Sequence, residues 1–245
     1  MLPFSILYGN FEIDFLEREY MLNIKTFHFN ELQECCSVIW DDTKECAIID
    51  PGFYKASERD RLDGFIRDNG LKPVKILLTH GHFDHVFGLK ECAGMYGIPV
   101  FMDPAEKDTL ESCDYFCKMF GFDTPDTDVA TTDIKDGDTI TVGHSELSVL
   151  STPGHTPGGV CFLDKADKVL FSGDTLFAGC IGRTDHPLGD YDKLMESIFQ
   201  KLMPLEGDIT VIPGHGPQTS IADERTKNPF LQPFNLPMEE DGEKE

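Results

Sequence analysis

The first half of the chain alternates short apolar runs with longer segments whose apolar residues recur every three or four positions. Runs rich in Val, Ile and aromatic residues, bounded by turn residues, predict strands. Segment 57–70 predicts an amphipathic helix, because Leu62, Phe65 and Ile66 fall on one face and Gly70 ends the pattern. The predicted strands are 23–30, 37–42, 45–52, 74–79 and 98–102, and the predicted helices are 57–70, 85–97 and 104–121.

Polar residues 123–138 interrupt this pattern and predict a crossing to a second half of similar character. Two halves of this kind predict an α/β fold with sheets packed together and helices outside, within one domain. In the second half the predicted strands are 139–142, 146–152, 159–164, 168–174 and 208–214, and the predicted helices are 191–203 and 221–231.

The two ends of the chain differ from the patterned part, so the expected folded domain is 22–232. Residues 1–21 begin apolar but carry four acidic residues, which predicts an N-terminal extension that could be disordered rather than a signal peptide. Met1 and Met21 are both candidates for the start of the protein. Residues 233–245 end in MEEDGEKE and predict a solvated acidic tail. No apolar run is long enough to span a membrane.

Acidic residues dominate the charged positions: 44 Asp and Glu oppose 21 Lys and Arg, for a net charge of -23. This charge argues against nucleic acid and anionic membrane surfaces as partners, and the oligomeric state is left open. The eight cysteines show no paired metal-binding spacing and do not predict a disulfide framework. We interpret them as small buried hydrophobic residues in a reducing cytoplasm, with a redox pair at Cys113 and Cys117 as the alternative.

A dense group of histidines follows the apolar strand 74–79, in the stretch LLTHGHFDHVFG. In extended backbone alternate residues face the same side, so His80 and His82 can point at one ion. Asp84 and His85 are adjacent, so their side chains diverge and can reach a second point nearby. Imidazole and carboxylate together suit zinc, iron or manganese. The H-x-H-x-D-H order therefore predicts a metal site rather than isolated structural histidines.

Three more residues of metal-binding type occur in a recurring context, each after an apolar strand and a glycine. They are His155 in VLSTPGH, Asp174 in VLFSGD and His215 in TVIPGH. Each alone is equally consistent with an ordinary turn at a strand end. Strand ends that gather at one edge would bring these loops together, and such edges are where sites are usually built.

Five motifs, in the same order, resemble the metallo-β-lactamase superfamily, and within it the glyoxalase II-like hydrolases, which act on hydroxyacylglutathione thioesters. The motifs are THGHFDH, STPGHTPGG, FSGDTLFAGCIGRTD, IPGHGPQT and ERTKNPFL, and the resemblance extends from about residue 22 to residue 232. It implies a four-layer αββα sandwich, which agrees with the pattern of strands and helices.

The resemblance also implies a hydrolase with two divalent metal ions, zinc being favoured and iron or manganese being alternatives. A hydroxide held between the ions would attack the carbonyl of a small-molecule thioester or ester, with Asp84 and Asp174 in catalytic positions. The implied ligands are His80, His82 and His155 for the first ion, Asp84, His85 and His215 for the second, and Asp174 for both.

Residues around the ligands have weaker expectations. Asp50 follows a buried-looking strand and either orients a ligand histidine or starts the turn at Pro51. Arg183 in GCIGRTD lies where the resemblance implies a group that binds a substrate carboxylate, and the alternative is an exposed arginine paired with Asp185. Outside the ligand pattern, His28, His144 and His186 are interpreted as structural or surface residues.

Two departures from glyoxalase II keep the substrate open. Only thirty residues follow His215, and the stretch GHGPQT lacks the tyrosine of that family, so a glutathione thioester is in doubt. The first alternative is a persulfide dioxygenase with one iron on His80, His155 and Asp174, although that family lacks GHGP. The second is a metal-binding protein without catalysis, which gives no reason for a full ligand set.

Overall fold

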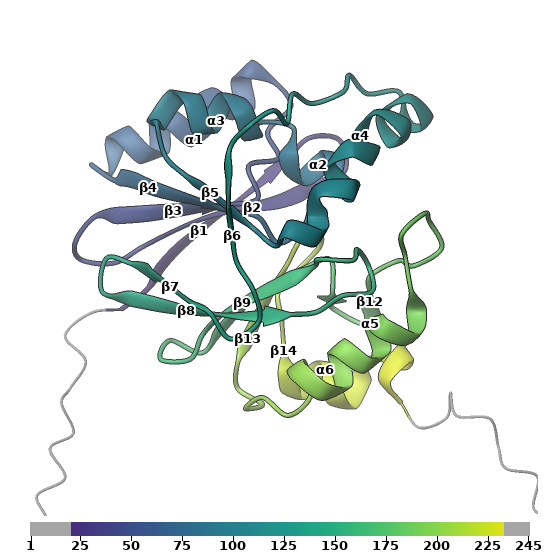
Figure 1. Ribbon diagram of the computed structural model, residues 1–245. Coiled ribbons are helices and arrows are strands. Elements are labelled where there is room, and N and C mark those ends of the chain that lie inside the picture. Colours follow the sequence, from purple (N-terminus) through teal and green to yellow (C-terminus); the bar gives the residue numbers. More distant parts are fainter. Residues whose placement is uncertain (1–20, 233–245) are drawn as a thin grey trace, which may run out of the picture.

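The first half of the chain forms a six-stranded sheet in the computed structural model, which describes residues 21–232 (Figure 1). The first three strands are antiparallel neighbours, and the last four run parallel to one another. In sheet order the strands are β1 (Asn23–Phe29), β2 (Glu34–Trp40), β3 (Glu45–Ile49), β4 (Lys72–Leu77), β5 (Val100–Met102) and β6 (Thr131–Asp133).

Helices cover the outer face of this sheet (Figure 1). In α1, Leu62 and Ile66 are buried, as the predicted apolar face requires, and they pack against Val38, Ile48 and Ile76 of the sheet. The helices of this half are α1 (Ala56–Asp68), α2 (Phe83–Val86), α3 (Leu89–Tyr96), η1 (Pro104–Glu106) and α4 (Lys107–Phe120).

The second half forms another six-stranded sheet, covered by its own helices (Figure 1). Its strands, in sheet order, are β14 (Thr219–Ser220), β13 (Thr210–Pro213), β10 (Val169–Gly173), β9 (Val160–Asp164), β8 (Ser145–Ser151) and β7 (Thr139–Val142). Strands β11 (Leu176–Phe177) and β12 (Cys180–Ile181) pair separately. The helical segments are α5 (Tyr191–Ser197), η2 (Ile198–Leu202), α6 (Ile221–Lys227) and η3 (Pro229–Leu231).

A central core lies between the two sheets. Because side chains alternate along a strand, Val38 and Ile48 face the helices while their neighbours Ile39 and Ile49 face the other sheet. The latter pack in one cluster with residues of the second sheet such as Phe162. Helices, sheet, sheet and helices therefore form four layers, and the predicted αββα sandwich is confirmed.

Asp41, directly after β2, joins the two halves. Its buried carboxylate accepts hydrogen bonds from the backbone N–H of Thr43 at 2.9 Å, His144 at 2.5 Å and Ser145 at 3.0 Å. His144 lies in the turn between β7 and β8, and Ser145 is the first residue of β8. Although burial opposes ionisation, the Thr43 hydroxyl and these amides lower the pKa of Asp41. The carboxylate thus satisfies turn amides from both sheets.

The structure departs from the predicted elements in several places; the short strands β11, β12 and β14 have no predicted counterpart, and two further departures have a clear physical reason. The helix predicted at 85–97 is divided into α2 and α3 by Gly88, whose N–H donates to the carbonyl of Pro51 at 2.9 Å. A Cβ there would lie 2.4 Å from the Phe53 ring, so the contact requires glycine. The predicted crossing 123–138 contains β6, a short exposed edge strand whose polar sequence gave no strand signal.

The predicted N-terminal extension and acidic tail lie, except for Met21, outside the described residues, and the proposed domain limits stay a prediction. Within 21–232, no helix is both long enough and apolar enough to cross a membrane. All eight cysteines are free; seven are buried, as interpreted, and Cys180 is exposed.

Candidate metal centre

Four segments that follow strands meet at one edge of the stacked sheets, and all seven candidate ligands lie on three loops and on a loop that continues into α2. The first loop follows β4, and three loops from the second half approach it after β8, β10 and β13. The residues that they carry are His80, His82, Asp84 and His85 after β4, His155 after β8, Asp174 after β10 and His215 after β13.

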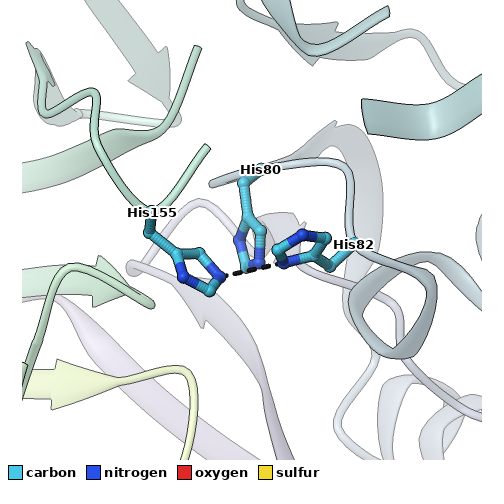
Figure 2. A group of neighbouring side chains, drawn as sticks. All are labelled: His80, His82 and His155. Atoms are coloured by element: carbon cyan, nitrogen blue, oxygen red, sulfur yellow. Dashed lines mark hydrogen bonds between the residues drawn. The ribbon is translucent and has the colours of Figure 1, made fainter. Parts of the chain in front are cut away.

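Three histidines from both halves form one possible metal-binding group. One nitrogen each from His80, His82 and His155 lies within 4.8 Å of the others, and all three side chains are buried. Figure 2 shows the three rings converging, with His155 approaching from a different loop than His80 and His82. Nδ1 of His82 lies 2.9 Å from Nε2 of His155. This is a hydrogen-bond distance, and it also brings the two nitrogens within reach of one ion.

A second possible group consists of Asp84, His85 and His215, again from both halves. Nε2 of His215 lies 3.1 Å from Oδ2 of Asp84 and 3.3 Å from Nε2 of His85. Asp84 and His85 are buried in α2, whose first turn they occupy. Although Asp84 and His85 are neighbours in the chain, each therefore brings one ligand atom to the same possible metal position, as predicted.

Asp174 lies between the two groups. Its Oδ2 is 3.4 Å from Nε2 of His155 in the first group and 3.8 Å from Nε2 of His215 in the second. Its Oδ1 is 3.4 Å from Nε2 of His85. A carboxylate with one oxygen within reach of both groups has the arrangement of a ligand shared by two ions.

Two buried atoms of the candidate ligands indicate whether the site suits metal ions. Nε2 of His80 and Oδ1 of Asp174 are buried and have no hydrogen-bond partner among the described residues. Buried polar atoms are normally satisfied, and an unsatisfied one calls for an explanation such as a bound ion. Nitrogen and carboxylate donors of this kind fit zinc, iron or manganese. The residues present therefore fit a centre with two metal ions.

Hydrogen bonds on the far side of the rings orient most of the histidines. Nδ1 of His155 lies 2.7 Å from the carbonyl of Arg183, and Nδ1 of His215 lies 3.0 Å from the carbonyl of Leu32. Nδ1 of His85 lies 3.0 Å from Oδ2 of Asp50. Each contact favours a proton on Nδ1 and leaves Nε2 available as a metal ligand, as in many metal sites.

Asp50 supports two parts of the centre at once. Besides His85, it accepts hydrogen bonds from the backbone N–H of Thr79 at 2.8 Å and from its hydroxyl at 2.6 Å. That hydroxyl lies 3.0 Å from Nδ1 of His80. The backbone of Asp50 has a φ of 50°, in the left-handed region that residues with a side chain rarely adopt. Of the two interpretations of Asp50, orientation of ligand histidines is the one that these contacts favour.

The two groups differ in their electrostatics. Burial and neighbouring imidazoles hold the pKa of His80 and His82 well below the usual histidine range. Although burial opposes a charge there too, Asp174 and Asp84 raise the pKa of His85. In turn, His215 and His85 hold the pKa of Asp174 well below the usual range despite its burial. The first group thus presents neutral imidazoles, the form that binds metal, and the carboxylates add negative charge beside it.

Glu106, which the sequence did not indicate, joins two of the ligand loops. Its side chain is fully buried, and its two oxygens accept one backbone N–H each, from Gly81 at 2.7 Å and from Gly158 at 2.6 Å. Gly81 lies between His80 and His82, and Gly158 belongs to the loop of His155. One carboxylate therefore holds both loops of the three-histidine group. Its single signal in the sequence is an acidic residue near a helix start, which occurs in most proteins.

A pocket of about 570 Å³ opens over the centre. Five candidate ligands lie in its lining, together with Arg183, whose guanidinium binds both carboxylate oxygens of Asp185 at 2.9 and 3.1 Å. His186, interpreted from the sequence as a structural or surface residue, also lies in the lining. Its ring centroid is 5.0 Å from that of His82 and 5.1 Å from that of His155. The other side of the pocket consists mainly of aromatic side chains from α4.

The remaining histidines lie away from the pocket lining. His28 lies 3.4 Å from the sulfur of Cys35, and His144 lies beside Asp42. Asp41, Asp42 and His144 could also hold an ion by their spacing, but two of them are exposed and the Asp41 carboxylate already accepts three backbone N–H groups.

Comparison with known proteins gives the same family as the motifs. A model of the metallo-beta-lactamase superfamily matches residues 30–215, a range that contains all seven candidate ligands. Hydroxyacylglutathione hydrolase GloC of Haemophilus influenzae is 40% identical over 214 residues, which are 86% of this chain and 98% of GloC.

Solved structures agree in fold. The crystal structure of BLEG-1 B3 metallo-beta-lactamase is similar with a TM-score of 0.79 at 34% identity, and the match covers 85% of this chain and 99% of that one. TTHA1623, crystallised in a di-iron-bound form, is similar with a TM-score of 0.76 at 33% identity, covering 84% and 100%. Almost the whole length of BLEG-1 and of TTHA1623 is thus matched by this chain.

Proposed function

The chain belongs to the metallo-beta-lactamase superfamily as a metallo-hydrolase, and from this premise we propose that it hydrolyses a thioester or a related acyl ester of a small molecule. The observation that carries the proposal is the position of Asp174 between two groups of three ligands each. We assign the seven residues the roles that the motifs imply, with Asp174 as the shared ligand.

Bound at these residues, two divalent ions would lower the pKa of a water molecule and polarise an acyl carbonyl. In the hydrolysis, water adds to the carbonyl carbon and the carbon–sulfur bond breaks, so that an acid and a thiol result. The attacking water gives up a proton. Asp84 and Asp174 are carboxylates that line the pocket beside both ligand groups, and we assign them the handling of that proton.

The thioester is supported by a relative rather than by the geometry. GloC is named a hydroxyacylglutathione hydrolase, and it is similar to this chain over almost its entire length. The pocket lining contains no serine or cysteine, so it agrees with direct attack by water on either kind of ester. Zinc remains the favoured ion, with iron and manganese as alternatives; the similar TTHA1623 was crystallised in a di-iron-bound form.

Arg183 is retained as a candidate for substrate binding. It lines the pocket, but its guanidinium already binds Asp185. A substrate carboxylate would therefore have to displace Asp185 or share the guanidinium with it.

A panel of acyl thioesters, tested on protein whose bound metal has been quantified, tests the proposal. We expect turnover in proportion to bound metal up to about two ions per chain, loss of turnover on chelation, and recovery when the ions are returned. Metal-loaded protein that hydrolyses no thioester or ester of the panel would contradict the proposed function.

The same protein can be tested against the alternative chemistry. A persulfide dioxygenase would consume oxygen with glutathione persulfide and would need one iron. The full second group of Asp84, His85 and His215 favours hydrolysis, because a single iron on the other ligands would leave those three residues without a role.

A further inference from the structure

Exposed apolar side chains gather on the wall of the pocket opposite the metal ligands. The side chains of Tyr115, Met119 and Phe120 in α4 are 53%, 57% and 50% exposed, and that of Leu32 is 38% exposed. All four line the pocket, whose wall also contains Phe116. Half-exposed large hydrophobic side chains concentrated around one opening are typical of a surface that binds an apolar ligand.

The same pocket offers little to a substrate with several carboxylates. Arg183 is the one lysine or arginine in the pocket lining, and Asp185 binds its guanidinium. Asp185 itself belongs to the lining, so the one guanidinium there is already neutralised within the pocket. Glutathione carries two carboxylates, each of which would normally be bound by a cation. The charges of the lining therefore favour a substrate that is recognised mainly by an apolar group.

We propose that the substrate of this site carries an apolar alkyl or aryl group that lies against the α4 wall formed by Tyr115, Phe116, Met119 and Phe120. The inference rests on the proposed function, since it names the class of thioester or ester that the site hydrolyses. A pocket of about 570 Å³ has room for such a group beside the metal centre. The acyl or thiol part that remains can be small and needs no paired carboxylates.

Binding of compounds that cannot be hydrolysed tests the wall separately from catalysis. S-alkyl thioethers from methyl to octyl are prepared on two carriers, glutathione and the neutral N-acetylcysteamine, and their affinities are measured by calorimetry with metal-loaded protein. Complete burial of a methylene group corresponds to about fourfold in affinity, and contact with one wall to about twofold. We expect about twofold per methylene on both carriers, or roughly a hundredfold from methyl to octyl.

Two double variants provide the matched comparison. Met119→Gln with Phe120→Gln replaces the two most C-terminal of the four wall side chains and leaves every buried residue unchanged, and we expect the gain per methylene to fall below about 1.5-fold. Met95→Gln with Phe199→Gln changes side chains of similar exposure, 42% and 49%, that do not line the pocket. This control should retain the dependence of the wild type on chain length. In hydrolysis of the corresponding acyl thioesters, kcat/KM should follow the same order.

The outcomes separate the wall from the chemistry. Affinity that depends on the glutathione carrier but not on chain length would overturn the inference, as would a wall variant that keeps the full chain-length dependence. A wall variant that alters only the oligomeric state in sedimentation would overturn it too, since the face would then bind another copy. Chain-length-dependent binding with no turnover of any thioester or ester would support the apolar wall and refute the proposed function.

Discussion

Substitution of Glu106 by Gln tests whether one buried carboxylate determines the geometry of the three-histidine group. In the wild type both oxygens of Glu106 accept a backbone N–H, from Gly81 at 2.7 Å and from Gly158 at 2.6 Å. Glutamine has nearly the same shape but offers one oxygen and one NH2 group. One of the two amides must therefore face a donor instead of an acceptor.

The expected loss follows from these two hydrogen bonds. A buried backbone N–H without an acceptor costs about 1–3 kcal/mol, and the remaining bond changes from a charge-assisted to a neutral one, which loses roughly another 1 kcal/mol. Burial of a neutral amide rather than a carboxylate offsets part of this. We expect Glu106→Gln to lower the free energy of unfolding by about 2–4 kcal/mol. Because the freed amides belong to loops that carry ligands, metal affinity should fall by about tenfold or more.

Glu224→Gln is the control. Glu224 is likewise buried, and its carboxylate accepts hydrogen bonds from the Thr219 hydroxyl at 2.6 Å, the Gly179 N–H at 2.9 Å and the Asn228 amide at 2.8 Å. It lies in α6 and does not line the pocket over the metal centre. We expect a similar loss of stability in urea unfolding of the metal-free protein, with unchanged metal affinity.

The metal affinity of both variants, measured by competition with a chelator, decides whether Glu106 positions the metal ligands. Wild-type metal affinity in Glu106→Gln would refute the assigned positioning role, even if stability fell as expected. Equal losses of metal affinity in Glu106→Gln and Glu224→Gln would also refute it, because the effect would then arise from general destabilisation.

Three further substitutions test the centre and the junction between the sheets. His82→Ala should abolish thioester hydrolysis and reduce bound metal, as measured by elemental analysis, while far-UV circular dichroism stays that of the wild type; undiminished turnover would show that the metal centre is wrongly assigned. Gly214→Ala should lower metal occupancy by the same analysis, because the added Cβ would lie 2.2 Å from Oδ1 of Asp174 and 2.7 Å from Cε1 of His85, and full occupancy would argue against the described packing. Asp41→Asn should lower the free energy of unfolding by about 1–3 kcal/mol at pH 7. Since the folded pKa of Asp41 is lowered, the stability that its ionised form contributes is present above its unfolded pKa and is lost as the pH falls through the folded pKa. The free energies of unfolding of variant and wild type in urea should therefore converge in acid. A constant difference between them down to pH 2 would refute the role assigned to the ionised Asp41 carboxylate.

The elements that could be predicted, and the candidate ligands that the fold brings together, are those whose signals are local in the sequence. Extended geometry groups His80 with His82, adjacency separates Asp84 from His85, and His155, Asp174 and His215 each follow an apolar strand and a glycine. The two sheets likewise follow from apolar runs, and the αββα sandwich is confirmed. What could be predicted therefore depended on the chain within a few residues of each position.

The features that could not be predicted arise from contacts between distant segments. Glu106 binds amides 25 and 52 residues away, so no neighbouring residue indicates its role. The break between α2 and α3 depends on the Phe53 ring against Gly88, and the apolar wall of α4 could equally have been a core-facing helix surface. His186 lies outside the ligand motifs, so the sequence predicts a structural or surface residue, whereas the fold brings its ring beside that of His82.

The division of the ligands between the two halves links metal binding to the packing of the sheets. The three-histidine group is incomplete without His155, and the second group is incomplete without His215, so neither half alone contains a full site. Without an ion, the assembled centre leaves Nε2 of His80 and Oδ1 of Asp174 buried without hydrogen-bond partners, which is unfavourable. An ion that binds the assembled site more strongly than the unfolded chain stabilises the folded state by mass action. The same side chains proposed to perform hydrolysis would thereby also hold the two sheets together at this edge.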